Sequence, residues 1–367
     1  MNWKQAAFTL LSMMLAGGCH DSAVRDDHNS GINIRHLVTL GTEEGVGALS
    51  SPPSSIATDS RGRWYVTAPY DAGEERAFVF DSSGEYLQRI GGIGEGPGEF
   101  QRADVVTVSA GDSLIIRDSR TGRVSVFSSD YEFVRTIRGV APYSRAIELG
   151  DGTFVVNNTG YPKPPLTRFD RDGATLGTFG ETTEEFEPLF EYLRVVRVLT
   201  PGTGGRFWSA KYGFEYSITQ WDSSGTAISR LSPEREWFPP YDMAWGPAPD
   251  REPNAMIWGL WEDHGLLWVV AQVSDPQWNR GLGGSRRVEG HEVYQVLDPT
   301  QVWDALIEVI DPASDGRIVH QRRFEDALYA VVGPGVLYSF QETELGFWLI
   351  DVWQVELAST AATEDSP

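Results

Sequence analysis

The part of the sequence that most suggests chemistry, namely phosphate binding, is the glycine-rich segment 91–103, which reads GGIGEGPGEFQRA. Alternating glycines can cradle a phosphate, but a Walker-type loop also needs a Lys and a Ser or Thr after its last glycine. Here Glu99 and Phe100 follow, and Glu95 adds a second acid that would repel phosphate. A dinucleotide-binding loop must open a helix, whereas DVVTVS (104–109) has the pattern of a strand. We therefore interpret the segment as an architectural loop.

Arginine and aromatic residues recur at the ends of β-rich runs, although the chain carries a net charge of −22. Guanidinium groups bind anions, and aromatic rings commonly line ligand sites. These residues are candidates for one face that binds an anionic or aromatic ligand; the alternative is that they are solvated and form local salt bridges. The candidates are Arg102, Arg145, Arg194, Arg197, Tyr70, Arg120, Tyr161, Tyr212, Arg280, Arg286 and Arg287.

The histidines give no recognisable metal site. Four of the six lie in the N-terminal segment or in expected outer strands, which leaves His264 and His291, whereas a zinc site needs three or four ligands. Carboxylates such as Asp59, Asp118 and Glu148 are further possible metal ligands. The chain has no Gly-x-Ser-x-Gly motif, and no Ser/His/Asp set can be placed. We predict no catalytic residue, no metal and no cofactor.

The elements that would position these residues are short β-rich runs that repeat along the chain. Six segments join two such runs by a tight turn, which is the pattern of a β-hairpin. They are 56–66, 106–116, 146–156, 197–209, 260–270 and 330–340. A second hairpin with an Asp/Ser/Gly turn follows each of the first five: 78–90, 124–137, 166–179, 218–231 and 307–320. We expect the aspartates of these turns to bond their own backbone instead of a metal.

One strand is missing at the C-terminal end of this series. The last hairpin is followed by a single run, 346–357, while the N-terminal run 32–41 has no hairpin of its own. We infer that residues 32–41 supply the missing outer strand. The predicted fold class is all-β, a six-bladed β-propeller of four-stranded blades that spans 32–357, with the ring closed by the N-terminal strand in the last blade.

Within this fold the glycine-rich segment has an architectural role. Residues 41–56 and 91–106 are two versions of one pattern, and both lie between an outer strand and the next inner strand. Glycine allows the chain to cross tightly there. Leu49 and Phe100 are expected to fill the seams between neighbouring blades.

Residues 94–137 resemble the NHL repeat, with its Gly-rich lead, Gly-x-Phe, an Asp before a turn, and Arg-Val-x-Val-Phe before the outer strand. The likeness extends over residues 41–91. It decays later: residues 181–191 carry acids where the repeat has glycines. The resemblance implies an exported six-bladed propeller, a fold that hosts many unrelated functions. Propellers of related shape include amidating lyases and gluconolactonase-type lactonases that use a metal in the channel, and this is the alternative function.

The segment 274–304 in blade five is a long insertion where other blades use short loops. Loops of this length are usually functional or disordered. Its Trp and Arg residues suit a mobile cap over the channel mouth, and packing of the insertion on a neighbouring blade is the equally weighted alternative.

The N-terminus has the features of an export signal. Lys4 precedes an apolar run, 6–16, that is too short to span a bilayer. The run ends in LAGGC, which resembles the lipobox of bacterial lipoproteins, although Ala16 stands where an aliphatic residue is usual. We predict a signal peptide (1–18), lipidation of Cys19 and a tether (19–31); the alternative is a plain signal peptide. Cys19 is the sole cysteine, so no disulfide forms within the chain.

The acidic composition bears on possible partners. A strongly negative chain repels nucleic acid and anionic membrane surfaces, so attachment to a bilayer would depend on the lipid. The residue after Cys19 is His20 and not Asp, which favours anchoring of the protein in the outer membrane. The propeller would then face the periplasm or the cell surface. We expect a monomer with a disordered tail at 358–367. The predicted function is that of a membrane-anchored extracytoplasmic propeller that binds a protein or small ligand and catalyses no reaction.

Overall fold

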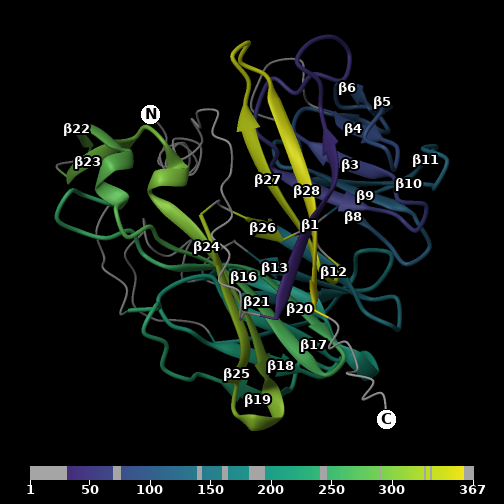
Figure 1. Ribbon diagram of the computed structural model, residues 1–367. Coiled ribbons are helices and arrows are strands. Elements are labelled where there is room, and N and C mark those ends of the chain that lie inside the picture. The colour runs from purple at the N-terminus through teal and green to yellow at the C-terminus, as the bar shows by residue number, and fades with distance from the viewer. Residues whose placement is uncertain are drawn as a thin grey trace, which may run out of the picture.

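Six β-sheets follow one another in a ring, in which the first strand of each sheet contacts that of the next, from β2 (Ser55–Thr58) through β8 (Ala103–Val108), β12 (Tyr143–Glu148), β16 (Arg197–Pro201) and β20 (Met256–Asp263) to β26 (Tyr329–Ala330). Figure 1 labels strands of all six sheets. The computed structural model describes residues 31–68, 76–138, 143–158, 164–181, 195–239, 246–288, 291–325, 328–330 and 333–358. Within these residues, six antiparallel sheets have four strands each, and two short ribbons have two. The prediction of a six-bladed β-propeller is confirmed.

The first three blades follow the predicted hairpins in order. Blade one contains β2 (Ser55–Thr58), β3 (Trp64–Thr67), β4 (Ala77–Phe80) and β5 (Tyr86–Ile90). Blade two contains β8 (Ala103–Val108), β9 (Leu114–Asp118), β10 (Arg123–Phe127) and β11 (Phe133–Ile137). Blade three contains β12 (Tyr143–Glu148), β13 (Phe154–Asn158), β14 (Leu166–Phe169) and β15 (Thr175–Phe179).

The other blades are built in the same way. Blade four contains β16 (Arg197–Pro201), β17 (Phe207–Lys211), β18 (Ile218–Trp221) and β19 (Ala227–Leu231). Blade five contains β20 (Met256–Asp263), β21 (Leu266–Ser274), β24 (Trp303–Asp311) and β25 (Arg317–Phe324). Blade six contains β26 (Tyr329–Ala330), β27 (Val336–Glu342), β28 (Trp348–Leu357) and β1 (Ile32–Leu40).

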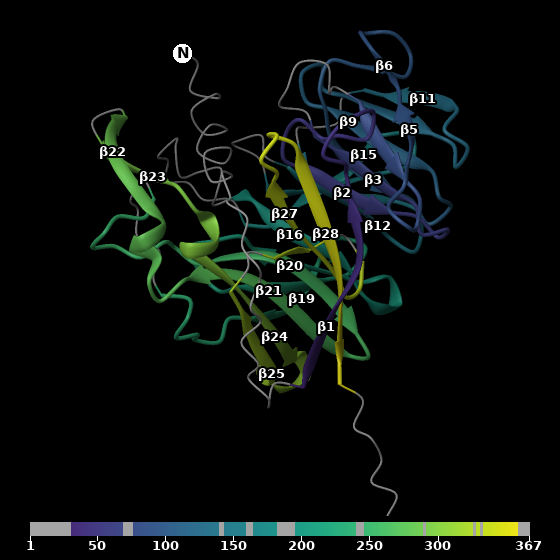
Figure 2. The same ribbon diagram turned by 45° about the horizontal axis from the view of Figure 1, so that its top comes forward.

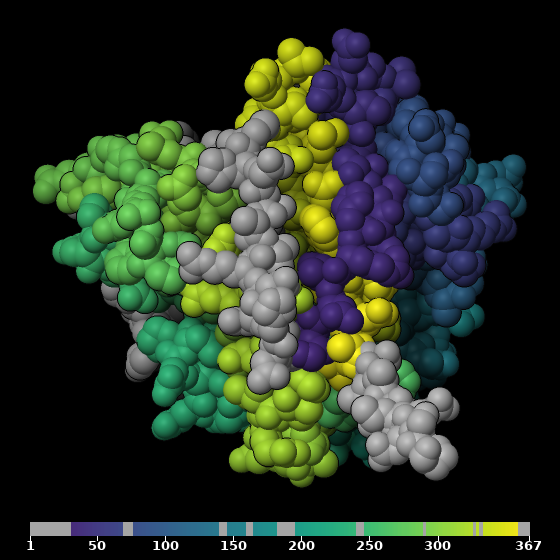
Figure 3. All heavy atoms as spheres, in the orientation of Figure 1, coloured from purple at the N-terminus to yellow at the C-terminus, as the bar shows by residue number. Residues whose placement is uncertain are grey.

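The two ends of the propeller meet in blade six. β1 pairs antiparallel with β28, from Ile32 opposite Leu357 to Leu40 opposite Ile350. Figure 3 shows the purple N-terminal strand lying directly against the yellow C-terminal strand. Ring closure by the N-terminal strand is therefore confirmed, and the strand covers the edge of β28 that would otherwise be unpaired.

The glycine-rich segment crosses from blade one to blade two. β6 (Gly92–Ile93) and β7 (Glu99–Phe100) pair in parallel, and the Glu99 carboxylate accepts the Gly96 N–H at 2.7 Å. A backbone donor that could have bound a phosphate is thus already used. Gly91 has φ +87°, and a Cβ there would collide with the ring of Phe100.

Large apolar side chains fill the seams between blades. Phe100 is fully buried in one cluster with residues of blades one and two. Leu49 is fully buried in a second cluster that joins blades six and one. Both predicted seam residues are confirmed.

The aspartates of the outer hairpin turns close their own loops, as expected. The Oδ1 atom of Asp81 accepts from the backbone of Ser83 and Glu85 at 2.8 and 3.0 Å. Asp170 and Asp222 make the same pair of contacts in blades three and four. These carboxylates are structural elements of the turns.

The insertion of blade five forms a hairpin of its own, β22 (Leu282–Val288) and β23 (His291–Val296). In Figures 1 and 2 this hairpin stands at the side of the ring, apart from β12 and β26.

Among the described residues, no helix is both long and apolar enough to cross a bilayer.

Candidate functional site

The described candidate residues of the ring lie along one edge of the blades, where inner strands begin and second strands end. These ends coincide because the strands are antiparallel: Arg197 at the start of β16 is opposite Lys211 at the end of β17. Arg102 precedes β8, Arg120 follows β9, Arg145 lies on β12 and Tyr212 follows β17. Tyr70, Tyr161, Arg194 and Cys19 lie outside the described residues.

Arg145 in blade three reaches across the ring to blade five. Its Nη2 atom donates a hydrogen bond to the carbonyl of Trp258 on β20, at 3.0 Å. The inner strands contact one another in sequence around the ring, with β16 of blade four between β12 and β20. A contact that bypasses blade four must therefore lie on the side of the inner strands that faces the ring axis.

Aromatic rings from blades four, five and six gather around this contact. The ring centroids of Tyr212 and Trp258 are 4.9 Å apart, and those of Trp258 and Tyr329 are 5.0 Å apart, both edge to face. Tyr329 in turn stacks on Tyr338, at 5.4 Å. We name Arg145, Tyr212, Trp258, Tyr329 and Tyr338 the Arg145 cluster. It combines residues of blades three, four, five and six.

The cluster is enclosed but still reaches solvent. Tyr212 is buried, whereas Arg145, Trp258, Tyr329 and Tyr338 keep part of their surface exposed. The indole Nε1 of Trp258 donates to Gln272 Oε1 at 2.6 Å, which fixes the plane of this ring. The rings therefore present ordered, partly open apolar surface beside a guanidinium.

The electrostatics of the cluster are dominated by one charge. Desolvation lowers the pKa of Arg145, with a smaller opposing effect of Tyr338 and Tyr212. Burial raises the pKa of Tyr338 to about 12 and raises that of Tyr329. The two phenols therefore stay neutral at pH 7. In the described part of the chain, Arg145 forms no ion pair, so its charge is uncompensated.

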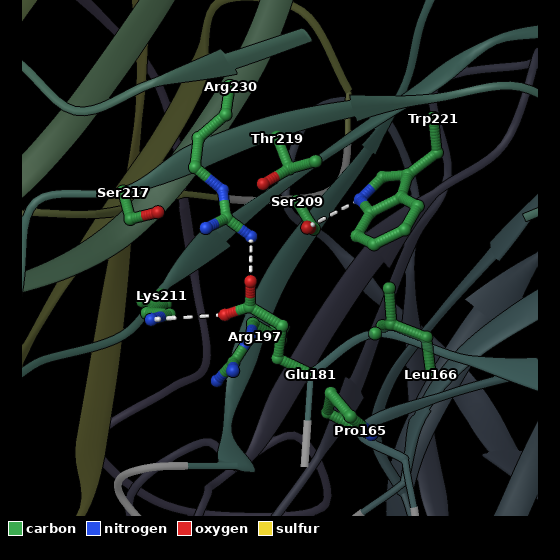
Figure 4. Close-up of a pocket in the computed structure, with 11 residues that line it drawn as sticks. Pro165, Leu166, Glu181, Arg197, Ser209, Lys211, Ser217, Thr219, Trp221 and Arg230 are labelled. Carbon is green, nitrogen blue, oxygen red and sulfur yellow. Dashed lines mark hydrogen bonds and ion pairs between the residues drawn. The ribbon is translucent and has the colours of Figure 1, made fainter. Parts of the chain in front are cut away.

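A pocket beside Arg197 differs from this cluster because its charges are paired (Figure 4). Glu181 accepts from Arg230 Nη2 at 2.5 Å and lies 4.0 Å from Lys211 Nζ, which also bonds Glu215. Burial lowers the pKa of Arg197 to about 10, and Glu215 and Glu181 oppose this effect. The cavity volume is about 20 Å³, roughly one water molecule. The charged side chains at this pocket therefore form a salt-bridge network with one another.

The arginines of the insertion do not join the Arg145 cluster. Arg280, Arg286 and Arg287 are exposed, and the β22–β23 hairpin stands away from β12 (Figure 2). The base of the insertion packs firmly: Trp278 Nε1 donates to the Ala248 carbonyl at 3.0 Å, beside a small core that contains Trp303. This arrangement favours the packing interpretation over the cap.

The possible metal ligands are separated and engaged elsewhere. Asp59 accepts from the backbone of Arg61 and Arg63, at 3.0 and 2.9 Å. Asp118 accepts from three backbone N–H groups, and Glu148 accepts from one. Within the described ranges, no group of three or more His, Cys, Asp or Glu side chains could hold a metal ion.

Sequence reasoning missed three members of the cluster, Trp258, Tyr329 and Tyr338. Each lies inside an apolar strand run, where an aromatic side chain is expected to be core. Tyr329 is the first residue of β26 and Trp258 is the third of β20, positions near the edge that carries the arginines. The position of Tyr329 and Trp258 near this edge is the sequence signal that could have identified them as site residues.

Comparison with known proteins supports the fold. The DUF5128 family model, described as a 6-bladed β-propeller, matches residues 47–163. A search of the curated proteins found no match. The chain is similar to a Bacteroides fragilis protein described as exported, with TM-score 0.59 and 13% identity over 94% of this chain and 98% of that one. A DUF4221 family member of Bacteroides vulgatus gives TM-score 0.58 and 11% identity, over 90% and 99%. The chain is a six-bladed β-propeller.

Proposed function

We propose that the protein is an exported, lipid-anchored propeller that binds a ligand, without catalysis, at the edge where its inner strands begin. The observation that carries this proposal is the Arg145 cluster. An arginine without a described carboxylate partner lies next to partly open aromatic rings near the ring axis. Ligand sites commonly combine apolar walls with a few convergent polar groups.

The envelope location is supported by the sequence. A short apolar run ends at the sole cysteine, and a polar stretch separates Cys19 from the first strand at Ile32. In this arrangement a lipid holds the propeller near a membrane while the net charge of −22 keeps the rest of the chain away from anionic headgroups. The fold likeness to a protein described as exported agrees with this location.

Binding can be tested with the full-length protein in detergent. We expect the low-molecular-mass fraction of a cell-envelope extract to raise the melting temperature, because a ligand that binds only the folded state stabilises it. Arg145→Met should abolish the increase. Arg61→Met is the matched control, since Arg61 is exposed and pairs weakly with Asp130 at 3.8 Å. An unchanged melting temperature in the wild type would contradict the binding function.

A further inference from the structure

We propose that the Arg145 cluster binds a small aromatic monocarboxylate, whose carboxylate pairs with Arg145 and whose flat body contacts Trp258, Tyr329 and Tyr338. The inference rests on the proposed binding function and adds the chemical class of the ligand. It follows from the charge, the number of cations and the shape of the surrounding surface.

The charge of Arg145 calls for an anion from outside the protein. A guanidinium has five N–H donors, and among the described residues one of them is used, by the Trp258 carbonyl. Arg117 and Arg235, which also have little exposure, have carboxylate partners: Arg117 donates to Asp104 through Nε at 3.0 Å, and Arg235 to Glu308 at 3.0 Å. Buried Arg123 instead donates to Thr121 and to the backbone carbonyls of Glu95 and Glu99. The chain has 52 acidic residues, and a desolvated arginine that has no carboxylate partner among the described residues and still reaches solvent is suited to bind a ligand anion.

A single cation favours a single negative charge. Tyr212 and Tyr338 are the titratable groups that influence the pKa of Arg145, and Tyr338 is neutral at pH 7. Arg197, on the next inner strand, is under the influence of Glu181 and Glu215 instead. A phosphate dianion would need more positive charge than the described cluster supplies, whereas a carboxylate matches one guanidinium in charge and geometry.

The surface next to Arg145 suits a flat apolar group. The partly exposed rings of Trp258, Tyr329 and Tyr338 lie in series, with centroids 5.0 and 5.4 Å apart. Aromatic pairs favour edge-to-face and offset stacking, and a ligand ring would add one more member to this series. The hydrogen bond to the Trp258 carbonyl holds the guanidinium in place beforehand, which lowers the entropic cost of binding.

The test compares probes that differ in one group, by isothermal titration of the full-length protein in detergent at pH 7. Indole-3-acetate should bind about tenfold or more tightly than its neutral isostere indole-3-acetamide, since a charge-assisted hydrogen bond contributes that much. Benzoate should bind more tightly than phenyl phosphate. Arg145→Met should remove the preference for the carboxylate, and Arg61→Met should keep it.

Each other outcome overturns the assignment. Equal affinity for acid and amide would mean that Arg145 is no anion anchor, although binding at the rings would stand. Tighter binding of phenyl phosphate would replace the monocarboxylate with a phosphate. If no probe binds the wild type, the ligand class is wrong, and the binding function is then decided by the extract experiment. Arg145→Gln, which keeps a donor for the Trp258 carbonyl, replaces Arg145→Met if the latter melts early.

Discussion

Glu308 and Arg235 form a buried ion pair, with Arg235 Nε 3.0 Å from Glu308 Oε2 and both side chains almost inaccessible to solvent. The pair ties the segment after β19 to β24 of blade five. Tyr216 and Trp237 also donate to the carboxylate, at 3.2 and 2.6 Å, and Gln321 donates at 2.9 Å. Both oxygens of Glu308 are thus fully used at the junction of blades four and five.

Glu308→Gln should destabilise the propeller by about 3 kcal/mol, because it leaves the Arg235 charge buried without a counterion and places an amide against donors. Urea denaturation measures the change. Asp130→Asn is the control: Asp130 pairs with Arg61 across 3.8 Å at the surface, so its loss should cost about 0.5 kcal/mol or less. Equal effects of the two substitutions would contradict a structural role for the buried pair.

Deletion of residues 32–40 should open the ring. It removes the partner of β28 and exposes a ten-residue strand edge that carries Trp348, Ile350 and Val352. Unpaired edges of this kind associate with other chains. We expect aggregation and a lower melting temperature, measured by light scattering and calorimetry. Removing the last nine residues, 359–367, should do neither. A deletion variant that stays monomeric and melts normally would refute the ring-closing role of β1.

Cys19→Ala should release the protein from the membrane without changing its stability. The reason is that the thiol is the predicted lipidation site and lies outside the propeller. Fractionation after a high-salt wash measures the attachment, and the melting temperature of the released protein is the control. Recovery of the variant in the membrane pellet would exclude a lipid anchor on Cys19.

The fold could be predicted from sequence because each blade carries local signals: turn residues between β-rich runs, and a long apolar residue such as Phe100 at a seam. The position of β1 followed from counting strands. The site could be predicted only in part. Arg145 and Tyr212 were identified from their places at strand ends, but Trp258, Tyr329 and Tyr338 look like ordinary core residues. Their proximity to Arg145 depends on how blades three to six are arranged around the ring, which no local pattern records.

Asp304 provides a pH-dependent prediction. It is buried on β24, and its Oδ2 accepts from Arg323 Nε at 2.5 Å. Burial raises its pKa to about 6, with a further contribution from Asp275, while Arg323 opposes the shift. The unfolded value is about 3.9. Between these two values the folded state binds more protons than the unfolded state.

The free energy of unfolding should therefore fall as the pH rises from about 4 to about 6, by up to about 2 kcal/mol from this group. Because other carboxylates titrate in the same range, the measurement compares urea denaturation of the wild type and Asp304→Asn at each pH. The wild type should lose stability relative to the variant over this interval, and the difference should be constant above pH 7. Parallel profiles across the whole range would show that Asp304 titrates normally and that its burial is offset by Arg323.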